Sequence, residues 1–394
     1  MLKEKIKELS KKIFLEVIKN RRYLHANPEL SFEEYNTSAF IKSKLDEIGV
    51  SYQSMANTGI VALIKGSKSS SSIIALRADM DALPITEVSG REYGSQNQGI
   101  MHACGHDVHA SSLLGTAKIL NTLKDKFGGT VKLIFQPGEE KLPGGASIMI
   151  KEGVLENPAP QAILGQHVMP LIETGKVGFR SGKYMASSDE IYVRVIGKGG
   201  HGAQPQQNID PIVITAHIIT ALQQIVSRIA DPKIPSVLSF GKIKADGATN
   251  VIPNEVYLEG TFRTFNEEWR KQAHQKMKKM AEGMAESMGA KCEFEIRNGY
   301  PFLINEEKLT ESVRSYAEDY LGKENVEDLD LWLAAEDFAY YSQNADACFY
   351  RLGTANTSKG ITSPVHTPTF DIDENALQLS TGLMAYLTIK QLGN

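Results

Sequence analysis

Residues 73–81 read IIALRADMD, a short apolar run that ends in two aspartates. Residues 131–135, which include one lysine, and residues 162–164 are nearly continuous apolar runs of the same kind. Runs that are apolar on both faces are typical of strands buried in a parallel sheet, and helical stretches such as residues 111–123 separate them. The sequence therefore predicts an α/β fold with a mainly parallel, doubly wound sheet. The serine-rich patch at residues 69–72 is predicted to be a loop.

Polar residues follow these predicted strands at the point where each strand ends. Asp79 and Asp81 follow the first strand, Glu139 and Glu140 the second, and His167 the third. In doubly wound sheets, ligands bind just beyond the carboxyl ends of the strands. We therefore expect the functional site to lie at this edge of the sheet.

The pattern changes after about Ser187. From there, strands and helices are predicted in the order β-α-β-β-α-β, which is that of a ferredoxin-like α+β unit. Its first helix begins at Asp210-Pro211, with the aspartate as N-cap and the proline at the first helical position. We expect residues 187–297 to form a domain inserted into a larger one, which is made of residues 1–186 and 298–394.

Composition excludes several classes of protein. The 394 residues carry 43 Lys+Arg against 47 Asp+Glu, so no basic excess is available for a nucleic-acid partner. Three scattered cysteines do not form a disulfide framework. No stretch approaches the roughly 18 consecutive apolar residues of a membrane helix. The sequence predicts a cytoplasmic protein with no membrane partner.

Histidine and cysteine gather in one part of the chain. Four of the nine histidines lie between residues 102 and 167, and Cys104 stands two residues before His106. Thiolate and imidazole are the preferred ligands of zinc and similar metals. Taken alone, this pair is as compatible with a structural thiol beside a solvated histidine as with a metal site.

Glu139-Glu140 strengthens the metal hypothesis. Two adjacent carboxylates are compatible with a solvated loop, but neighbouring side chains of an extended segment point in different directions. One glutamate can then bind a metal while the other takes a proton from water and passes it to a leaving amine. This arrangement suits hydrolysis of an amide bond.

Several motifs together resemble the M20 metallopeptidase family. They occur in the family's order and are Arg77 to Pro84, Met101 to Asp107, Phe135 to Glu140, Gly199 to His201, Asn250 to Pro253, and Glu336 to Phe338. The resemblance extends from Arg22 to His366. It is to the branch with hippurate hydrolases, N-acyl-amino-acid amidohydrolases and hydrolases of indole-acetyl (IAA) amino acids. The activity that it implies is hydrolysis of N-acyl-amino acids to a carboxylic acid and a free amino acid.

The resemblance also implies a site for two divalent metal ions, with Zn, Mn, Co and Ni all compatible with mixed ligands. Cys104 would bridge the two ions. His106 and His167 would complete one ligand set, and Glu140 and His366 the other.

Further roles follow from the same resemblance. Glu139 would be the general base and then the proton donor, and Asp81 would orient a metal ligand. His201 would reach the active site of a partner subunit and stabilise an oxyanion, because the inserted domain forms a homodimer in this family. Asn250 and Arg263 resemble residues that line the substrate side. For Arg263, a surface ion pair is an equally good interpretation.

Other hypotheses remain open from sequence. The same site could serve a dipeptidase or carboxypeptidase. A cysteine hydrolase with Cys104 as nucleophile would leave Glu139-Glu140 unexplained. A non-catalytic binding protein would have lost Glu139 or a ligand, whereas all are present. Departures from the family pattern, among them Gln166, are expected near the pocket and leave the acyl group and amino acid open.

Overall fold

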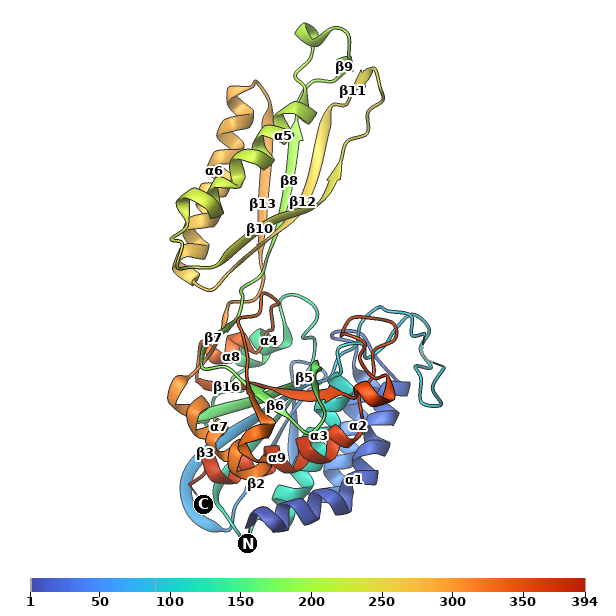
Figure 1. Ribbon diagram of the computed structural model, residues 1–394, viewed down its shortest axis with the longest axis vertical. Coiled ribbons are helices and arrows are strands. Elements are labelled where there is room, and N and C mark those ends of the chain that lie inside the picture. The colour runs from blue at the N-terminus through green and yellow to red at the C-terminus, as the bar shows by residue number, and fades with distance from the viewer. Residues whose placement is uncertain (1, 89, 394) are drawn as a thin grey trace. The chain divides into compact units, whose positions relative to one another are not determined.

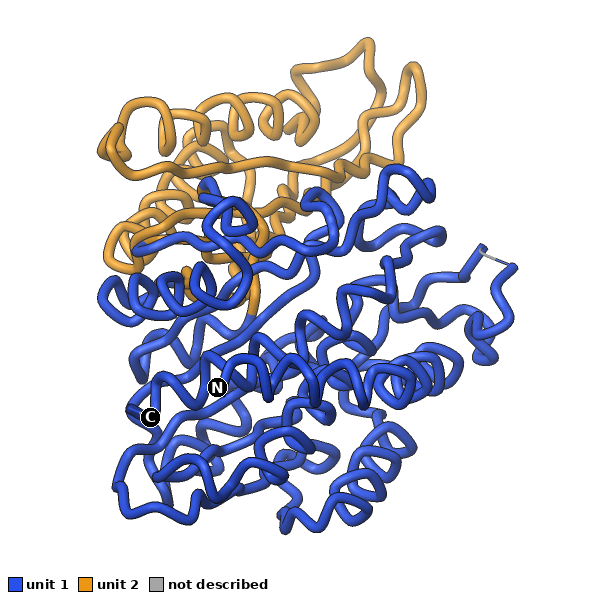
Figure 2. Tube along the Cα trace, turned by 60° about the horizontal axis from the view of Figure 1, so that its bottom comes forward, with its two compact units in different colours: residues 1–182, 304–330, 337–394 blue, residues 183–303, 331–336 orange. Residues whose placement is uncertain are grey.

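The computed structural model describes residues 2–88 and 90–393 and divides the chain into two compact units (Figure 2). The larger unit comprises Met1–Gly182, Ile304–Asp330 and Asp337–Asn394. The smaller unit comprises Lys183–Leu303 and Leu331–Glu336.

The larger unit is built on one mixed sheet. Its strands are β1 (Tyr52–Met55), β2 (Gly59–Lys65), β3 (Lys68–Asp79), β4 (Gly128–Gln136), β5 (Ala162–Glu173), β6 (Val177–Phe179), β15 (Val326–Asp328) and β16 (Asp346–Ala355). They follow the order β1-β2-β4-β3-β5-β16-β6-β15. The central strands β4, β3, β5 and β16 run parallel to one another, whereas β1, β2 and β6 pair antiparallel to their neighbours. The largely parallel sheet predicted from sequence is confirmed.

The serine patch was predicted wrongly. Residues 69–72 belong to the first part of β3, where Ser69, Ser70 and Ser71 are exposed and Ser72 is half-buried. The ladder shifts register here, between the pair Lys68–Gly128 and the pair Ile73–Thr130. The end of a strand that lies in solvent needs no apolar side chains, so serines can continue it. A serine-rich composition therefore does not distinguish such a strand end from a loop.

Helices pack against this sheet. They are α1 (Leu2–Ala26), α2 (Tyr35–Ile48), α3 (His106–Thr122), α4 (Gly145–Lys151), α7 (Glu307–Leu321), α8 (Ala339–Ser342) and α9 (Asn375–Gln391). Helices α1, α3 and α9 lie against one another (Figure 1). The spacing of Ile6, Leu9, Ile13 and Val17 predicts one apolar face of α1. Ile6, Ile13 and Val17 are buried, and Leu9 is partly buried against the same core.

The smaller unit has the predicted ferredoxin-like order of elements. They are β8 (Asp189–Ile196), α5 (Pro211–Leu222), β10 (Ser236–Lys244), β12 (Glu255–Thr264), α6 (Glu267–Ser287) and β13 (Lys291–Asn298). The antiparallel sheet has the order β10-β12-β8-β13. Asp210 caps α5, since its side chain accepts hydrogen bonds from the backbone N–H groups of Ile212 and Val213. A short ribbon of β9 (Gly200–His201) and β11 (Val251–Ile252) completes this unit.

One helical stretch passes a length-and-composition test for a membrane span. It is Pro211–Ile229, which the sequence did not single out. In the structure, α5 places Ile214, Ile218 and Leu222 in the core of the smaller unit. The face of α5 that carries these three residues is apolar because it packs in the core of this unit.

Candidate metal centre

Cys104 and His106 are placed by the beginning of α3. The helix begins at His106, and Gly105 before it has φ +84°, a conformation that favours glycine. A Cβ at Gly105 would lie 2.7 Å from Val168 Cγ2 of β5, so the chain turns directly against that strand. Cys104 is thereby held next to the first residue of the helix.

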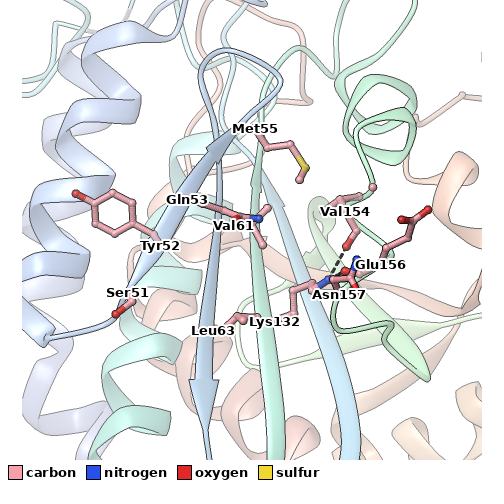
Figure 3. A pocket seen from close by; sticks show the side chains of 11 residues that line it. Ser51, Tyr52, Gln53, Met55, Val61, Leu63, Lys132, Val154, Glu156 and Asn157 are labelled. Atoms are coloured by element: carbon pink, nitrogen blue, oxygen red, sulfur yellow. Dashed lines mark hydrogen bonds between the residues drawn. The ribbon is translucent and has the colours of Figure 1, made fainter.

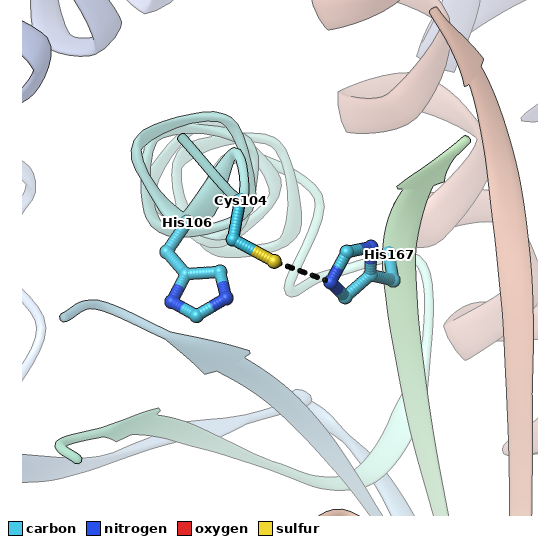
Figure 4. A group of neighbouring side chains, drawn as sticks. All are labelled: Cys104, His106 and His167. Carbon is cyan, nitrogen blue, oxygen red and sulfur yellow. Dashed lines mark hydrogen bonds between the residues drawn. The ribbon is translucent and has the colours of Figure 1, made fainter. Parts of the chain in front are cut away.

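Two further imidazoles converge on the Cys104 thiol. His167 Nε2 on β5 lies 3.4 Å from Cys104 Sγ, and Figure 4 shows the two side chains pointing toward one another. His366 Nε2 lies 3.3 Å from the same sulfur. His366 has φ +62° and is fixed by its backbone N–H, which donates to Ala103 O at 2.8 Å. The structure therefore brings residues 104 and 366 together across 262 positions of sequence.

Glu140 joins this cluster from the loop after β4. Its Oε1 lies 3.2 Å from His366 Nε2. The His366 side chain is 52% exposed and that of Glu140 is 14% exposed, whereas Cys104, His106 and His167 are buried. The cluster thus opens to solvent on the His366 side, where a small molecule could enter.

His106 is aimed by Asp81. His106 Nδ1 donates to Asp81 Oδ1 at 3.1 Å, so Nε2 is the ring nitrogen that can bind a metal once it has lost its proton. Nε2 is buried and has no hydrogen-bond partner among the described residues, and Asp79 Oδ2 lies 3.6 Å from it, beyond hydrogen-bond distance. A buried ring nitrogen in this state is what a metal ligand requires before the ion binds.

Glu139 lies beside the cluster and is buried. One of its carboxylate oxygens is within 4.8 Å of ligand atoms of His106 and Glu140. Its Oε1 accepts a hydrogen bond of 3.3 Å from the backbone N–H of Asp337. The Asp337 carboxylate is held in turn by Arg77, Gln136 and the backbone N–H of Ala146. Glu139 is therefore oriented by a buried polar network.

The electrostatics of the cluster favour cations. Although burial opposes a charged imidazole, the charge of Asp79 and the hydrogen bond to Asp81 raise the pKa of His106 to about 10. Burial, followed by the charges of Glu140 and Glu139, raises the pKa of the Cys104 thiol well above its ordinary value. Both effects reflect excess negative charge that a divalent ion would neutralise. The same acidic setting argues against Cys104 as an independent nucleophile.

Distances between donors also fit divalent ions. Ligand atoms at about 2.0–2.3 Å from a tetrahedral ion lie about 3.3–3.8 Å apart. The separations of 3.2–3.4 Å among Cys104, His167, His366 and Glu140 match this spacing. The mixed sulfur, nitrogen and oxygen donors suit borderline first-row metals.

His109 and Asp79 have other partners. His109 Nδ1 donates to Asp79 Oδ1 at 2.5 Å, and His109 Nε2 accepts from the backbone N–H of Val168 at 2.9 Å. Both ring nitrogens are thus used within the protein. Asp79 also receives Arg77 at 2.6 Å. His109 therefore holds the backbone of β5 next to the cluster, and Asp79 holds His109.

Three predicted site residues belong to the smaller unit and not to the unit that holds the cluster. His201 lies on β9, is exposed, and accepts from Ala203 N at Nδ1, so that Nε2 remains available. Asn250 is next to it, since Asn250 O accepts from Gly202 N. Arg263 on β12 contacts Thr261 and forms no ion pair among the described residues. The surface ion pair considered for Arg263 is therefore not observed there.

Gln166 does not take part in the pocket. Its side chain donates to Ser380 Oγ on α9 and accepts from Tyr350 OH. Successive side chains of a strand point to opposite faces, so Gln166 faces the helices when His167 faces the cluster. The expectation that this departure lies near the pocket is wrong.

A separate cavity of about 220 Å³ lies between β1, β2 and the loop after α4 (Figure 3). Lys132 on its wall donates to the backbone carbonyls of Val154 and Glu156, each at 2.7 Å. Burial lowers the pKa of Lys132 to about 8. This lysine fixes the loop, and none of the predicted site residues line the cavity.

The α/β sheet, the converging donors and the adjacent glutamate together define a metal-dependent hydrolase. Comparison with known proteins is consistent with this class. The family model "Peptidase family M20/M25/M40" matches residues 75–389. The chain belongs to this family and is a metal-dependent amidohydrolase.

Known relatives match most or nearly all of the chain. An N-acyl-L-amino acid amidohydrolase of Geobacillus stearothermophilus is 44% identical over 77% of this chain and 82% of its own length. Thermostable carboxypeptidase 2 of Saccharolobus solfataricus is 37% identical over 99% of this chain and 98% of its own length. A Bacillus subtilis crystal structure described as a dinuclear metal-binding peptidase of the M20 family has a TM-score of 0.81 and 34% identity. The match covers 97% of this chain and 99% of that one.

Proposed function

We propose that this protein hydrolyses N-acyl-amino acids to a carboxylic acid and a free amino acid. The observation that carries the proposal is the gathering of Cys104, His106, His167, Glu140 and His366, with Glu139 held beside them. The N-acyl-L-amino acid amidohydrolase among its relatives supports this substrate class.

The ligand set is proposed as two overlapping groups. His106 and His167 would hold one ion with Cys104, and Glu140 and His366 would hold the other, with Cys104 shared. Zn, Mn, Co and Ni all accept such donors. Two bound ions would polarise the amide carbonyl and acidify a water.

Glu139 then moves the proton. Its carboxylate takes a proton from the attacking water and delivers it to the nitrogen of the leaving amino acid. The Asp337 N–H orients the Glu139 carboxylate through a hydrogen bond to Oε1. Burial around Glu139 keeps bulk water from competing for this transfer.

Residues of the smaller unit would complete the site. We propose that His201 donates from Nε2 to the oxyanion in the active site of the partner within a homodimer. Arg263, which forms no ion pair among the described residues, would receive the carboxylate of the amino acid, and Asn250 would line the substrate side.

A panel assay tests the substrate class. Enzyme stripped with chelator and reloaded with single metals is given acetyl, benzoyl and indole-acetyl amino acids, together with dipeptides. We expect turnover of acyl-amino acids that disappears with the metal and returns with it. Turnover confined to dipeptides would instead support the carboxypeptidase or dipeptidase alternative, which the Saccharolobus solfataricus relative favours.

Glu139→Gln tests the proton-transfer role. The amide keeps the size of the side chain but cannot take a proton, so kcat should fall by about 10²–10⁴-fold. Metal content, measured by elemental analysis, should stay at the wild-type value because Glu139 is not one of the proposed ligands. Wild-type turnover in this variant would remove Glu139 from the mechanism.

A further inference from the structure

A short segment between α1 and α2 lies against the loop that carries Glu139 and Glu140. It consists of Ser31, Phe32, Glu33 and Glu34. No step of the proposed reaction uses it. Three separate contacts connect it to the loop or to the residues that aim the ligands.

The first contact is made by the Glu34 carboxylate, which is fully buried. Glu34 Oε1 accepts from Gly138 N and from Phe32 N, each at 2.8 Å. Glu34 Oε2 accepts from Thr58 Oγ1 at 2.7 Å. Both oxygens are thus occupied, and one of them fixes the backbone directly before Glu139.

The second contact is the Phe32 ring. Gly138 has φ +58°, and a Cβ there would lie 2.3–2.7 Å from atoms of this ring. Phe32 itself has φ +68°, which is uncommon for a bulky residue. Strain of this kind persists only where the surroundings enforce it, and the hydrogen bond from Phe32 N to Glu34 is one such constraint.

The third contact runs through Asp81. Ser31 Oγ donates to Asp81 Oδ2 at 2.6 Å, and the backbone N–H of Glu140 donates to the same oxygen at 3.0 Å. Asp81 Oδ1 meanwhile receives His106 Nδ1. The segment therefore touches the supports of two proposed ligands and of the proposed base.

We propose that residues 31–34 form a positioning clamp, in which the Glu34 carboxylate fixes Gly138 and so aims the side chains of Glu139 and Glu140. The proposal rests on the function proposed above and names Glu34 as a positioning residue. The property of Glu34 that the clamp requires is a side chain long enough to bring an acceptor oxygen to Gly138 N. Its charge and its proton are not required, since neither oxygen is left to face a substrate.

Two variants separate reach from charge. Glu34→Gln keeps the length and one acceptor oxygen for the Gly138 and Phe32 N–H groups, and its amide can donate to Thr58. Glu34→Asp keeps the charge but withdraws the carboxylate by about one C–C bond, roughly 1.5 Å. Both changes are small, so both proteins should fold.

Glu29 supplies the matched controls. It is half-buried in the same connection, and its carboxylate likewise accepts backbone N–H groups, those of Asn36 and Thr37. It contacts neither the loop of Glu139 nor Asp81 through its side chain. Glu29→Asp and Glu29→Gln therefore report the general cost of such a change in this segment.

For Glu34→Asp we expect kcat to fall by about 10–100-fold with little change in KM, because small misplacements of catalytic groups cost this much. Metal titration with Co²⁺ should show one ion bound about tenfold more weakly, as when a ligand loses its support. Glu34→Gln and both Glu29 variants should stay within about threefold of wild type in both measurements.

The reverse pattern would overturn the proposal. If Glu34→Gln were impaired and Glu34→Asp active, the charge of Glu34 would matter and its reach would not. Equal behaviour of the Glu34 and Glu29 variants would likewise exclude a clamp. If the wild type hydrolysed no acyl-amino acid, the proposed function would fail, while the Co²⁺ titration would still decide whether the clamp supports metal binding.

Discussion

Two histidines of the cluster, His106 and His167, are each oriented by the hydrogen bond that the second ring nitrogen makes. His106 gives Nδ1 to Asp81, and His167 gives Nδ1 to the carbonyl of Val168, so each presents Nε2. His109 differs because both of its nitrogens are bonded within the protein. Residue type thus indicates which side chains can bind a metal, and the partner of the second nitrogen decides which of them are available.

Asp81→Asn tests this principle at one residue. The amide must present its NH2 group either to the His106 Nδ1–H or to the donors Ser31 Oγ and Glu140 N, and both choices place donor against donor. We expect metal affinity to fall by about 10–100-fold, measured by competition with a chromogenic chelator. Asp46→Asn, which changes an exposed acceptor of the Tyr52 hydroxyl, should leave affinity unchanged. Equal affinities for the two variants would contradict the role of Asp81.

At the scale of elements, the ends of buried strands were predictable and their supports were not. The apolar runs gave the positions of β3, β4 and β5. Asp81 follows β3, and Glu139 and Glu140 follow β4, as expected. The expectation that His167 follows the third strand is wrong, because β5 continues to Glu173 and His167 lies within it. Glu34 escaped prediction, and Asp337 was noted only as part of the motif at residues 336–338, because a carboxylate in a loop has no periodicity that would give its role. Only the folded chain shows that each receives a backbone N–H group from the loop and helix next to the site. The nearest signal in the sequence is the density of acids around them.

A second buried polar network connects three elements of the smaller unit. Asp189 at the beginning of β8 receives Arg270 and His274 of α6 and the backbone N–H of Gly299 after β13. Although burial opposes the ionised form, hydrogen bonds from His274 and Arg270 hold the pKa of Asp189 below its ordinary value. The network joins the first strand, the second helix and the exit of this unit.

Asp189→Asn should destabilise the smaller unit at neutral pH. Removing the charge leaves the buried Arg270 without its main partner, a change that costs about 3–5 kcal/mol in comparable buried pairs. Since the pKa of Asp189 is lower in the folded chain, its stabilisation is present above about pH 4 and is lost as the pH falls through the folded value. The difference between wild type and variant should therefore shrink in acid.

Tryptophan fluorescence can measure this loss, because Trp269 and Trp332, the two tryptophans of the chain, both belong to the smaller unit. Urea unfolding followed at several pH values gives the free energy of unfolding for each protein. Asp246→Asn, which removes an exposed ion pair with Lys244, should change it by less than about 1 kcal/mol. A variant at Asp189 as stable as wild type would show that the network is dispensable.

For the whole molecule, the residues proposed to take part in the reaction are divided between the two compact units. The larger unit carries every proposed metal ligand and Glu139, and the smaller unit carries His201, Asn250 and Arg263. Residues 331–336, which are remote in sequence from the rest of the smaller unit, also belong to it. Local patterns predicted the elements of both units, but assignment of this short segment depends on contacts distant in sequence.

Subunit mixing tests whether His201 acts in the site of a partner. His201→Ala and Glu139→Gln homodimers should each lose about 10²-fold or more in kcat. In a dimer of one chain of each kind, one site would carry both defects and the other would have Glu139 from one chain and His201 from the other. Random pairing in a twofold dimer makes half of the dimers mixed, so co-expression should restore about a quarter of the wild-type activity.

Action within one chain makes a different prediction for the same mixture, because every chain then carries one defect and activity stays at the level of the single variants. Co-expression of Glu139→Gln with the double variant Glu139→Gln/His201→Ala controls for dosage, since no pairing of these chains assembles an intact site. Light scattering on the purified mixture establishes that dimers are present when activity is measured. Recovery in the first mixture and not in the control would require an active site shared between subunits, whereas equal activity in both would place His201 in its own chain's site or outside the reaction.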